Sequence, residues 1–174
     1  LNTYNPTVHA VIEATLAALA PMVPDHARGD GCGSRSIIIG GRSTRAGKGY
    51  VQYEIVGGGT GGRPGKDGMS GSAVHVSNSK IASVEIVESE FPTRVKRFEL
   101  VQDSAGPGTF RGGLGVRREY TNLGEARFNI RSTKHEIAPM GVLGGGLAQT
   151  GKLTMNPGTA DEKVLPSRYS DYPL

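Results

Sequence analysis

The segment from residue 57 to residue 71 constrains the fold of this chain more than any other part of its sequence. It contains eight glycines and Pro64 within fifteen residues. Glycine loses more backbone entropy on folding than any other residue, so this density is incompatible with a regular helix or strand. The sequence therefore predicts one long loop here, and long ordered loops inside compact domains are often functional.

Composition places the 174-residue chain among globular proteins and argues against several other classes. Glycine supplies 27 residues without the three-residue period of collagen, and hydrophobic residues make up 36%. No apolar run is long enough for a transmembrane helix, and no secretory signal peptide is visible. The net charge of +4 comes from scattered basic residues, so neither a nucleic-acid partner nor a membrane partner is expected.

The single cysteine, Cys32, excludes an intrachain disulfide framework and is consistent with a cytoplasmic location. It lies between two glycines, in a loop that we expect to be exposed. One interpretation is a nucleophilic pair with a histidine such as His75. The other is an ordinary free thiol.

Hydrophobic periodicity predicts a single α+β domain over residues 1–174, β-rich with sandwich-like antiparallel strands, two helices and long glycine-rich loops. The first helix is expected within residues 1–24, with His9 at its surface. The rest, residues 35–174, is expected to be β-rich, with the second helix near residues 82–91. Apolar residues spaced by three or four positions define the expected buried face of the first helix: Val8, Ile12, Leu16, Leu19 and Val23.

Short apolar segments between turn residues predict the strands. In one of them, Val51 and Tyr53 alternate with Gln52 and Glu54, which predicts an apolar buried face and a polar exposed face. The expected strands span residues 36–39, 49–56, 74–76 and 94–101, followed by a hairpin formed by residues 116–120 and 126–131.

The glycine run matches the dinucleotide-binding fingerprint at Gly57, Gly59 and Gly62, directly after a strand. That fingerprint needs a helix to begin at the third glycine, so that its amides face a pyrophosphate. The next residues are Arg-Pro-Gly, which prevents such a helix. A phosphate-binding P-loop also fails, because Asp67 stands where the hydroxyl that binds Mg²⁺ belongs.

Two interpretations stay open for the glycine loop. Its backbone amides, beside Arg63 and Lys66, could hold an anion or a carboxylate substrate. Alternatively, the loop is structural and packs against another domain or subunit. His75 follows the loop, and Asn78 lies three residues further on. A structural role, a substrate-facing role and metal ligation are all open for His75, although no two histidines have the spacing of a zinc site.

Two charged clusters also have a functional and a structural interpretation. The glutamates of the second expected helix could supply an acid–base carboxylate, or they form a solvated helix face. The arginines around a later glycine turn could bind a ligand, or they form salt bridges. These residues are Glu85, Glu88, Glu90, Arg111, Arg117 and Arg118.

Several motifs occur in order along the chain. They span residues 53–59 (YEIVGGG), 61–68 (GGRPGKDG), 75–78 (HVSN), 84–88 (VEIVE), 91–95 (FPTRV), 103–108 (DSAGPG), 111–119 (RGGLGVRRE) and 141–146 (GVLGGG). Together they resemble the C-terminal part of the B-type subunit of the hydantoinase B/5-oxoprolinase family, to which subunits of acetone and acetophenone carboxylases are related. Nearly all of residues 5–170 can be placed in this way.

The resemblance implies a β-rich segment of an ATP-dependent cyclic amide hydrolase. In that family an A-type actin/Hsp70-like ATPase subunit uses ATP to phosphorylate the substrate, and the B-type subunit completes the hydrolysis. The implied partners are therefore an A-type subunit and the remainder of a B-type subunit, in a hetero-oligomer. ATP and a divalent metal ion (Mg, Mn or Zn) are implied for the wider complex. No cofactor is expected in this chain, because the family's metal-binding residues lie in an N-terminal part that is absent here.

Seven residues at positions that match the family motifs are candidates to line the substrate cavity or an interface: Gly57, Gly58, Gly59, Arg63, Asp67, His75 and Asn78. The resemblance assigns none of them a catalytic or metal-binding role. Departures from the family pattern are Val74 and Ser77 in place of threonines and Phe91 in place of tyrosine. Because the chain begins with Leu1, a fragment, a proteolytic product or a small separate subunit is expected, and it should be inactive alone. A ketone carboxylase subunit and a purely structural assembly module are the alternatives.

Overall fold

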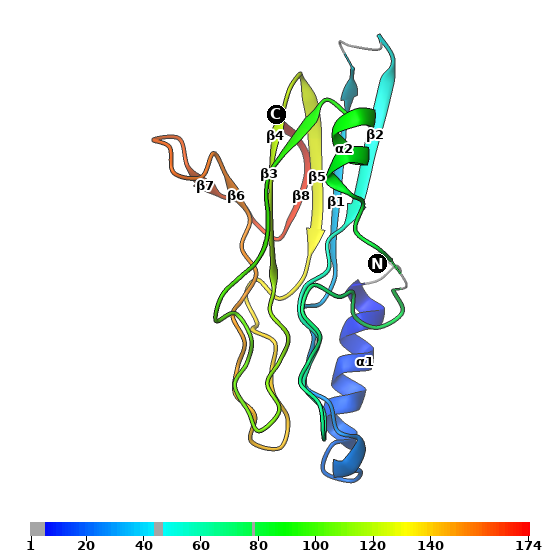
Figure 1. Ribbon diagram of the computed structural model, residues 1–174, viewed down its shortest axis with the longest axis vertical. Coiled ribbons are helices and arrows are strands. Elements are labelled where there is room, and N and C mark those ends of the chain that lie inside the picture. The colour runs from blue at the N-terminus through cyan, green and yellow to red at the C-terminus, as the bar shows by residue number, and fades with distance from the viewer. Residues whose placement is uncertain (1–5, 44–46, 78) are drawn as a thin grey trace.

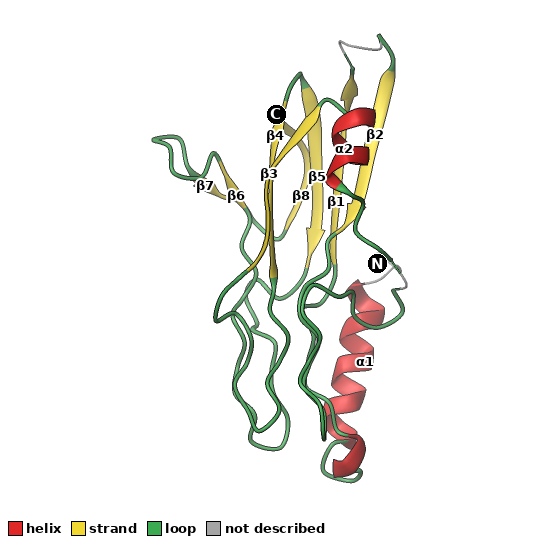
Figure 2. Cartoon of the chain, viewed as in Figure 1, coloured by secondary structure: helices red, strands yellow, loops and turns green. Residues whose placement is uncertain are grey.

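The computed structural model describes residues 6–43, 47–77 and 79–174. The molecule is elongated, with the strands at one end and α1 beside the glycine-rich loops at the other (Figure 1, Figure 2). The elements are α1 (Pro6–Leu19), a short 3-10 helix (Pro24–His26), β1 (Arg35–Arg42), β2 (Gly49–Ile55), α2 (Val84–Glu90), β3 (Thr93–Leu100), β4 (Val116–Asn122), β5 (Ala126–Ser132), β6 (Thr154–Met155), β7 (Lys163–Val164) and β8 (Arg168–Pro173).

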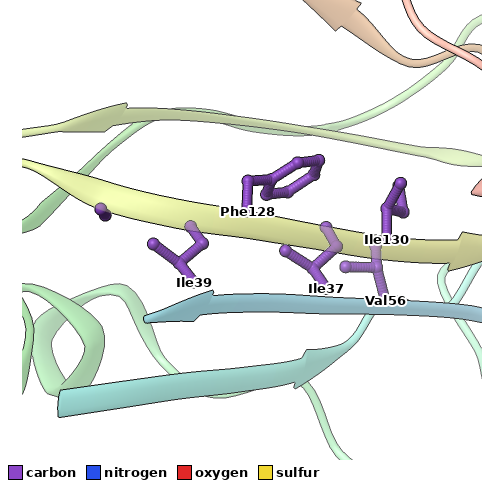
Figure 3. Packing of buried hydrophobic residues seen from close by; sticks show 6 residues of the cluster. Ile37, Ile39, Val56, Phe128 and Ile130 are labelled. Carbon is purple, nitrogen blue, oxygen red and sulfur yellow. The ribbon is translucent and has the colours of Figure 1, made fainter. Parts of the chain in front are cut away.

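The main sheet has four antiparallel strands in the order β2-β1-β5-β8. Its centre is the pairing of β1 with β5, where Ile37 lies opposite Ile130 and Ile39 lies opposite Phe128. Because side chains alternate along a strand, these four point to the same face. Together with Val56 they form the buried apolar core (Figure 3).

A second layer covers this face. It is made by β3 and β4, which pair with each other and not with the main sheet. Val116 and Tyr120 of β4 pack against the core. The result is a two-layer antiparallel sandwich with two helices and long loops, so the predicted β-rich α+β class is confirmed.

The short helix α2 follows from local signals at both ends. Ser83 caps it, accepting a hydrogen bond from the Ile86 N–H at 3.4 Å, and Pro92 follows directly after its C-cap residue. Val87 is buried. Glu88 accepts a hydrogen bond from the Val95 N–H at 2.9 Å, which ties the helix to β3.

The expected face of β2 is wrong. Gln52 and Glu54 are buried, whereas Val51 and Tyr53 are exposed. The polar side chains turn inward because the second layer brings partners for them, and a buried polar group is tolerated when it is paired. Thr93, for example, donates a hydrogen bond to the side-chain oxygen of Gln52 at 2.8 Å.

The expected face of α1 is also wrong. His9, which was expected at the surface, is buried, and so is Glu13 one turn later. Val8 and Leu19, from the predicted apolar face, are exposed. The helix turns its polar residues inward because the neighbouring loops supply a lysine and a backbone amide for Glu13.

Two strand predictions also fail. Strands β4 and β5 do not form the expected hairpin, because β4 pairs with β3 in one layer and β5 pairs with β1 and β8 in the other. The connection between them crosses from layer to layer instead of folding back. Residues 74–76 form no strand, since Val76 has a φ of 46°, which is outside the extended region.

No helix within residues 6–43, 47–77 and 79–174 is long and apolar enough to cross a bilayer.

Candidate functional site

The glycine loop runs as an extended backbone between three other backbone segments, near residues 29–32, 68–72 and 111–114. Cys32 donates its N–H to the Gly59 carbonyl at 2.8 Å, and Gly113 donates its N–H to the Thr60 carbonyl at 2.9 Å. The Thr60 N–H donates in turn to the Met69 carbonyl at 2.9 Å. These segments form a hydrogen-bonded bundle without regular secondary structure, which we call the glycine bundle.

Glycine is required in this bundle because the backbones approach one another too closely for a side chain. A Cβ at Gly59 would lie 1.9 Å from the Gly113 carbonyl oxygen, and one at Gly61 would lie 1.8 Å from the Gly29 carbonyl oxygen. Both distances are far shorter than a van der Waals contact. The density of glycine is thus explained by contacts within the chain itself.

Arg63 and Asp67 lie at the exposed end of this loop. Arg63 and Lys66 exchange backbone hydrogen bonds of 3.0 and 2.9 Å, which closes a turn through Pro64 and Gly65. Asp67 accepts a hydrogen bond from the Arg111 N–H at 2.8 Å and faces the Arg111 guanidinium at 3.8 Å. Asp67 therefore attaches the tip of the loop to the segment that precedes β4.

His75 lies beside His9 of α1. The two ring centroids are 6.4 Å apart and the rings are nearly perpendicular, at 85°. Burial lowers the pKa of both imidazoles, and the charge of Arg28 lowers that of His75 further. The backbone of His75 has the opposite, smaller effect on the pKa of His9. Among the described residues, neither ring nitrogen of His9 has a hydrogen-bond partner of ordinary geometry.

A buried ion cluster connects α1 to the segment after β5. The Lys134 ammonium lies 2.9 Å from the Glu13 carboxylate and 2.7 Å from the Asp30 carboxylate. Burial raises the pKa of Glu13, and Lys134 opposes this shift. Burial alone would lower the pKa of Lys134, but its hydrogen bonds to Asp30 and Glu13 raise it.

Cys32 is less exposed than we expected, since its residue is only partly accessible and its thiol faces Gly58. Burial raises the pKa of this thiol to about 11. A thiol is nucleophilic as its thiolate, so this environment favours the ordinary free thiol over an activated nucleophile.

A cleft of about 1480 Å³ opens beside the sandwich core and continues along the loops after β5. Gly57, Gly58 and Gly59 line this cleft, whereas Arg63, Asp67 and His75 are not part of its wall. Asn78 lies outside the described residues. The structure therefore separates the seven sequence candidates: three line the cleft, Arg63 and Asp67 lie at the tip of the glycine loop, His75 lies beside His9 of α1, and the seventh is not described.

The cleft wall also includes charged side chains that no sequence motif indicated. Arg35 begins β1, and Lys134 and His135 follow β5. Arg35 is about a hundred positions from Lys134 and His135 in the chain, so no local motif brings them together. The only available signal was the two-residue period of a strand, which places Arg35 on the same face of β1 as Ile37.

The described residues hold no group of three or more histidine, cysteine, aspartate or glutamate side chains arranged for a metal ion. The nearest arrangement of carboxylates, Glu13 with Asp30, is already occupied by the Lys134 ammonium. These residues do not fit a divalent metal ion.

Comparisons with known proteins assign the family. The family model described as "Hydantoinase B/oxoprolinase" matches residues 2–171. The B-type subunit of a putative D-/L-hydantoinase from Pseudomonas sp. (strain NS671) is 34% identical over 92% of this chain and 27% of its own length. A 5-oxoprolinase from Dictyostelium discoideum is 38% identical over 57% of this chain and 8% of its own length.

A solved structure shares the fold. The nucleotide-free structure of acetone carboxylase superposes with a TM-score of 0.59 and 23% identity, over 70% of this chain and 17% of that one. The chain thus spans only about a quarter of the length of the hydantoinase relative that it matches. Since the family model covers nearly all of its residues, the chain belongs to the hydantoinase B/oxoprolinase family.

Proposed function

We propose that this chain is part of an ATP-dependent cyclic amide hydrolase of the hydantoinase/5-oxoprolinase type, in which it lines the substrate cavity. The observation that supports this most directly is the cleft of about 1480 Å³. Its wall includes Gly57, Gly58 and Gly59 of the family motif at residues 53–59. The relatives that carry hydantoinase and 5-oxoprolinase names point to the same reaction class.

The chemistry of this reaction requires groups that we place elsewhere in the enzyme. Among the described residues Cys32 is held as a thiol, and the acidic pair Glu13 and Asp30 is held by Lys134. ATP and a divalent metal ion would therefore bind to other parts of the complex. We infer that this chain shapes the cavity and is inactive by itself.

The second proposed task is docking to the remainder of a B-type subunit. The only ionisable residues of α1, His9 and Glu13, are buried, and its outer side exposes apolar residues. Val11 is 60% exposed, and Met22 just after the helix is 75% exposed. A helix without charge on its outer side is typical of an internal helix of a larger body. The hydantoinase relative is long enough to supply that body, because this chain matches 27% of it.

The complete complex would be a hetero-oligomer with an A-type actin/Hsp70-like ATPase subunit, which we place in the cytoplasm. Its assembly is tested by co-purification of the A-type subunit with a B-type subunit that contains this chain. ATP-dependent hydrolysis of 5-oxoproline and of hydantoin is then measured on the complex. Turnover by the complex, and none by the 174-residue chain, would support the proposal. Hydrolysis by the isolated chain would contradict it.

A ketone carboxylase is the second candidate, and the structural likeness to acetone carboxylase favours it. ATP hydrolysis that depends on both bicarbonate and acetone would identify this activity in the same complex. A purely structural module is the third. It would tolerate His75→Ala and Arg63→Ala, whereas a loss of tenfold or more with intact assembly, equivalent to about 1.4 kcal/mol, would indicate a role in the site.

A further inference from the structure

Two cations of the cleft wall have no ion pair among the described residues: Lys152, which is exposed, and Arg35, which is largely buried. Arg118 is paired with Glu54 at 3.1 Å, Lys134 with Asp30 at 2.7 Å, and Arg117 with a glutamate of β3. Arg35 has no carboxylate within ion-pair distance among the described residues. Its one side-chain hydrogen bond there runs from its Nε to the Ser132 hydroxyl, at 3.2 Å. A guanidinium that is largely buried without a counter-ion is costly, which makes its surroundings a natural place for an anion.

Sheet register places this arginine in the cleft. Arg35 lies directly opposite Ser132 in the pairing of β1 with β5, one step beyond the pair of Ile37 and Ile130. Because residues i and i+2 share a face, Arg35 continues the inner row of the sandwich to the point where the core ends. Both Arg35 and His135 are part of the cleft wall.

His135 is held next to this arginine by the same hydroxyl. Its Nε2 lies 2.9 Å from the Ser132 oxygen, which also accepts the hydrogen bond from Arg35. The Ser132 hydroxyl also donates a hydrogen bond to the Thr133 carbonyl at 3.4 Å, and which atom donates between Nε2 and this hydroxyl depends on the tautomer of the ring. Burial and then the charge of Arg35 lower the pKa of His135, while Glu136 opposes this, so the ring is neutral at pH 7.

A glycine allows a loop backbone to pack closely against this pair. A Cβ at Gly151 would lie 2.5 Å from a terminal guanidinium nitrogen of Arg35 and 3.2 Å from Nε2 of His135. The backbone of this loop therefore covers the pair closely. Any larger residue would press on the guanidinium itself.

We propose that Arg35 and His135 form a carboxylate-binding site in the cleft. A guanidinium presents parallel N–H groups that match the two oxygens of a carboxylate, and the imidazole would add one further donor in the tautomer that is protonated on Nδ1. The site holds one uncompensated positive charge, which suits a monoanion better than a phosphate dianion. Resting on the proposed function, the occupant is a cyclic amide that carries a carboxylate, such as 5-oxoproline, or its ring-opened product.

Matched ligands test this without any turnover. L-5-oxoproline and 2-pyrrolidinone share the five-membered lactam ring and differ by the carboxylate. We expect L-5-oxoproline to bind saturably to the 174-residue chain and to shift the NMR signals of the His135 ring, and 2-pyrrolidinone to bind at least tenfold more weakly. Equal binding of the two lactams, or no shift at His135, would overturn the proposal. Inorganic phosphate that binds as tightly as 5-oxoproline would overturn the assignment to a carboxylate.

Substitutions at Arg35 provide a second, independent test. Arg35→Lys keeps the positive charge but removes the parallel N–H groups of the guanidinium, and we expect it to bind L-5-oxoproline about tenfold more weakly. Arg35→Gln also removes the charge and should abolish binding. The control is Arg127→Gln, because Arg127 is an exposed residue of β5 paired with Asp171 and is not part of the cleft wall. Circular dichroism establishes that each variant is folded, and the comparison of the two lactams on the unmodified chain is decisive where a variant does not fold. Binding that survives Arg35→Gln in a folded chain would contradict the proposal. Because ATP is absent, a failure here is distinct from a failure of the proposed hydrolase activity.

Discussion

Glu54 of β2 and Arg118 of β4 form an ion pair of 3.1 Å that joins the two layers of the sandwich. Their side chains are 4% and 1% exposed. Tyr120 donates a hydrogen bond to the same carboxylate, and Arg118 lies over the rings of Phe98 and Tyr120 at 4.7 and 5.5 Å. The polar inner face of β2 thus serves to hold β4 against the main sheet.

Removal of Glu54 should destabilise the chain strongly. Glu54→Gln leaves the buried charge of Arg118 without its counter-ion, which typically costs about 3–5 kcal/mol. Urea unfolding measures the loss. The control is Arg117→Gln, whose exposed pair with Glu99 should contribute less than about 1 kcal/mol. Equal effects of the two variants would contradict the structural role of the buried pair.

Packing of the glycine bundle predicts that Gly59→Ala is severely destabilising. The new methyl group would collide with the Gly113 carbonyl oxygen, and two backbones would have to separate. We expect a loss of about 3 kcal/mol or more in the free energy of unfolding. Gly124→Ala is the matched control, because a Cβ there meets nothing within 4 Å. A Gly59→Ala protein as stable as this control would show that the bundle is not closely packed.

The histidine pair predicts a loss of stability in mild acid. The folded-state pKa values of His9 and His75 lie below their ordinary value of 6.5, so the unfolded chain binds protons more readily. The free energy of unfolding should therefore fall as the pH drops through 6.5 toward the folded-state values. The raised pKa of Glu13 has the opposite effect, because its protonation stabilises the folded chain as the pH falls toward the ordinary value of 4.5. The charges of Arg28 and Asp30 also act on His75.

Thermal unfolding between pH 8 and pH 5.5 measures this dependence. His9→Gln removes one titrating group, so its melting temperature should vary less with pH than that of the unmodified chain. Direct NMR titration of the His9 ring gives the second readout. A midpoint above 6.5 would reverse the predicted sign.

Cys32 should react slowly with thiol reagents in the folded chain. A shift of the pKa from 9.0 to about 11 reduces the thiolate fraction at pH 8 about a hundredfold. A more basic thiolate is also a stronger nucleophile, which raises the reaction rate of each thiolate about tenfold. We therefore expect a rate about tenfold below that of the urea-unfolded chain, with steric shielding adding to the difference. A chromogenic disulfide reagent measures both rates. A folded chain that reacts faster than the unfolded one would point to an activated thiol.

The exposed apolar side of α1 predicts the effect of a charge at Val11. Val11→Lys should change the free energy of unfolding of the isolated chain by about 0.5 kcal/mol or less, because the position faces solvent. In a complete B-type subunit the same change should reduce the yield of assembled complex, because it would bury a lysine. Gln102→Lys, at an exposed loop position, is the control. Normal assembly of the Val11→Lys variant would exclude α1 from the interface.

Local sequence signals identified both helices and the strands β1 to β5, but not β6, β7 and β8. The proline after residue 91 marks the end of α2, and the β-branched run at residues 36–39 and the alternation around Phe128 indicate two strands of the core. The order of the glycine motifs also indicated the family, which the match over residues 2–171 confirms. The seven site candidates stay predictions, because their functional roles have not been tested.

Periodicity could not decide which face of an element is buried. An alternating strand has two faces, and the inner one is the face that finds partners. For β2 these partners are Thr93 and Arg118 from the second layer, so Gln52 and Glu54 turn inward. The pairing of β4 with β3, and not with β5, likewise depends on how the two layers meet.

By itself, the amino-acid sequence determined the family, the two helices, most strands and the long region that only glycine can build, because these follow from local conformational preferences and from motif order. Tertiary structure alone decided that His9 meets His75, that Lys134 joins Glu13 to Asp30, and that Arg35 shares a hydroxyl with His135. These groups are separated by 66 to 121 positions in the sequence. Their proximity is set by strand register and by close backbone packing, which local sequence patterns do not encode.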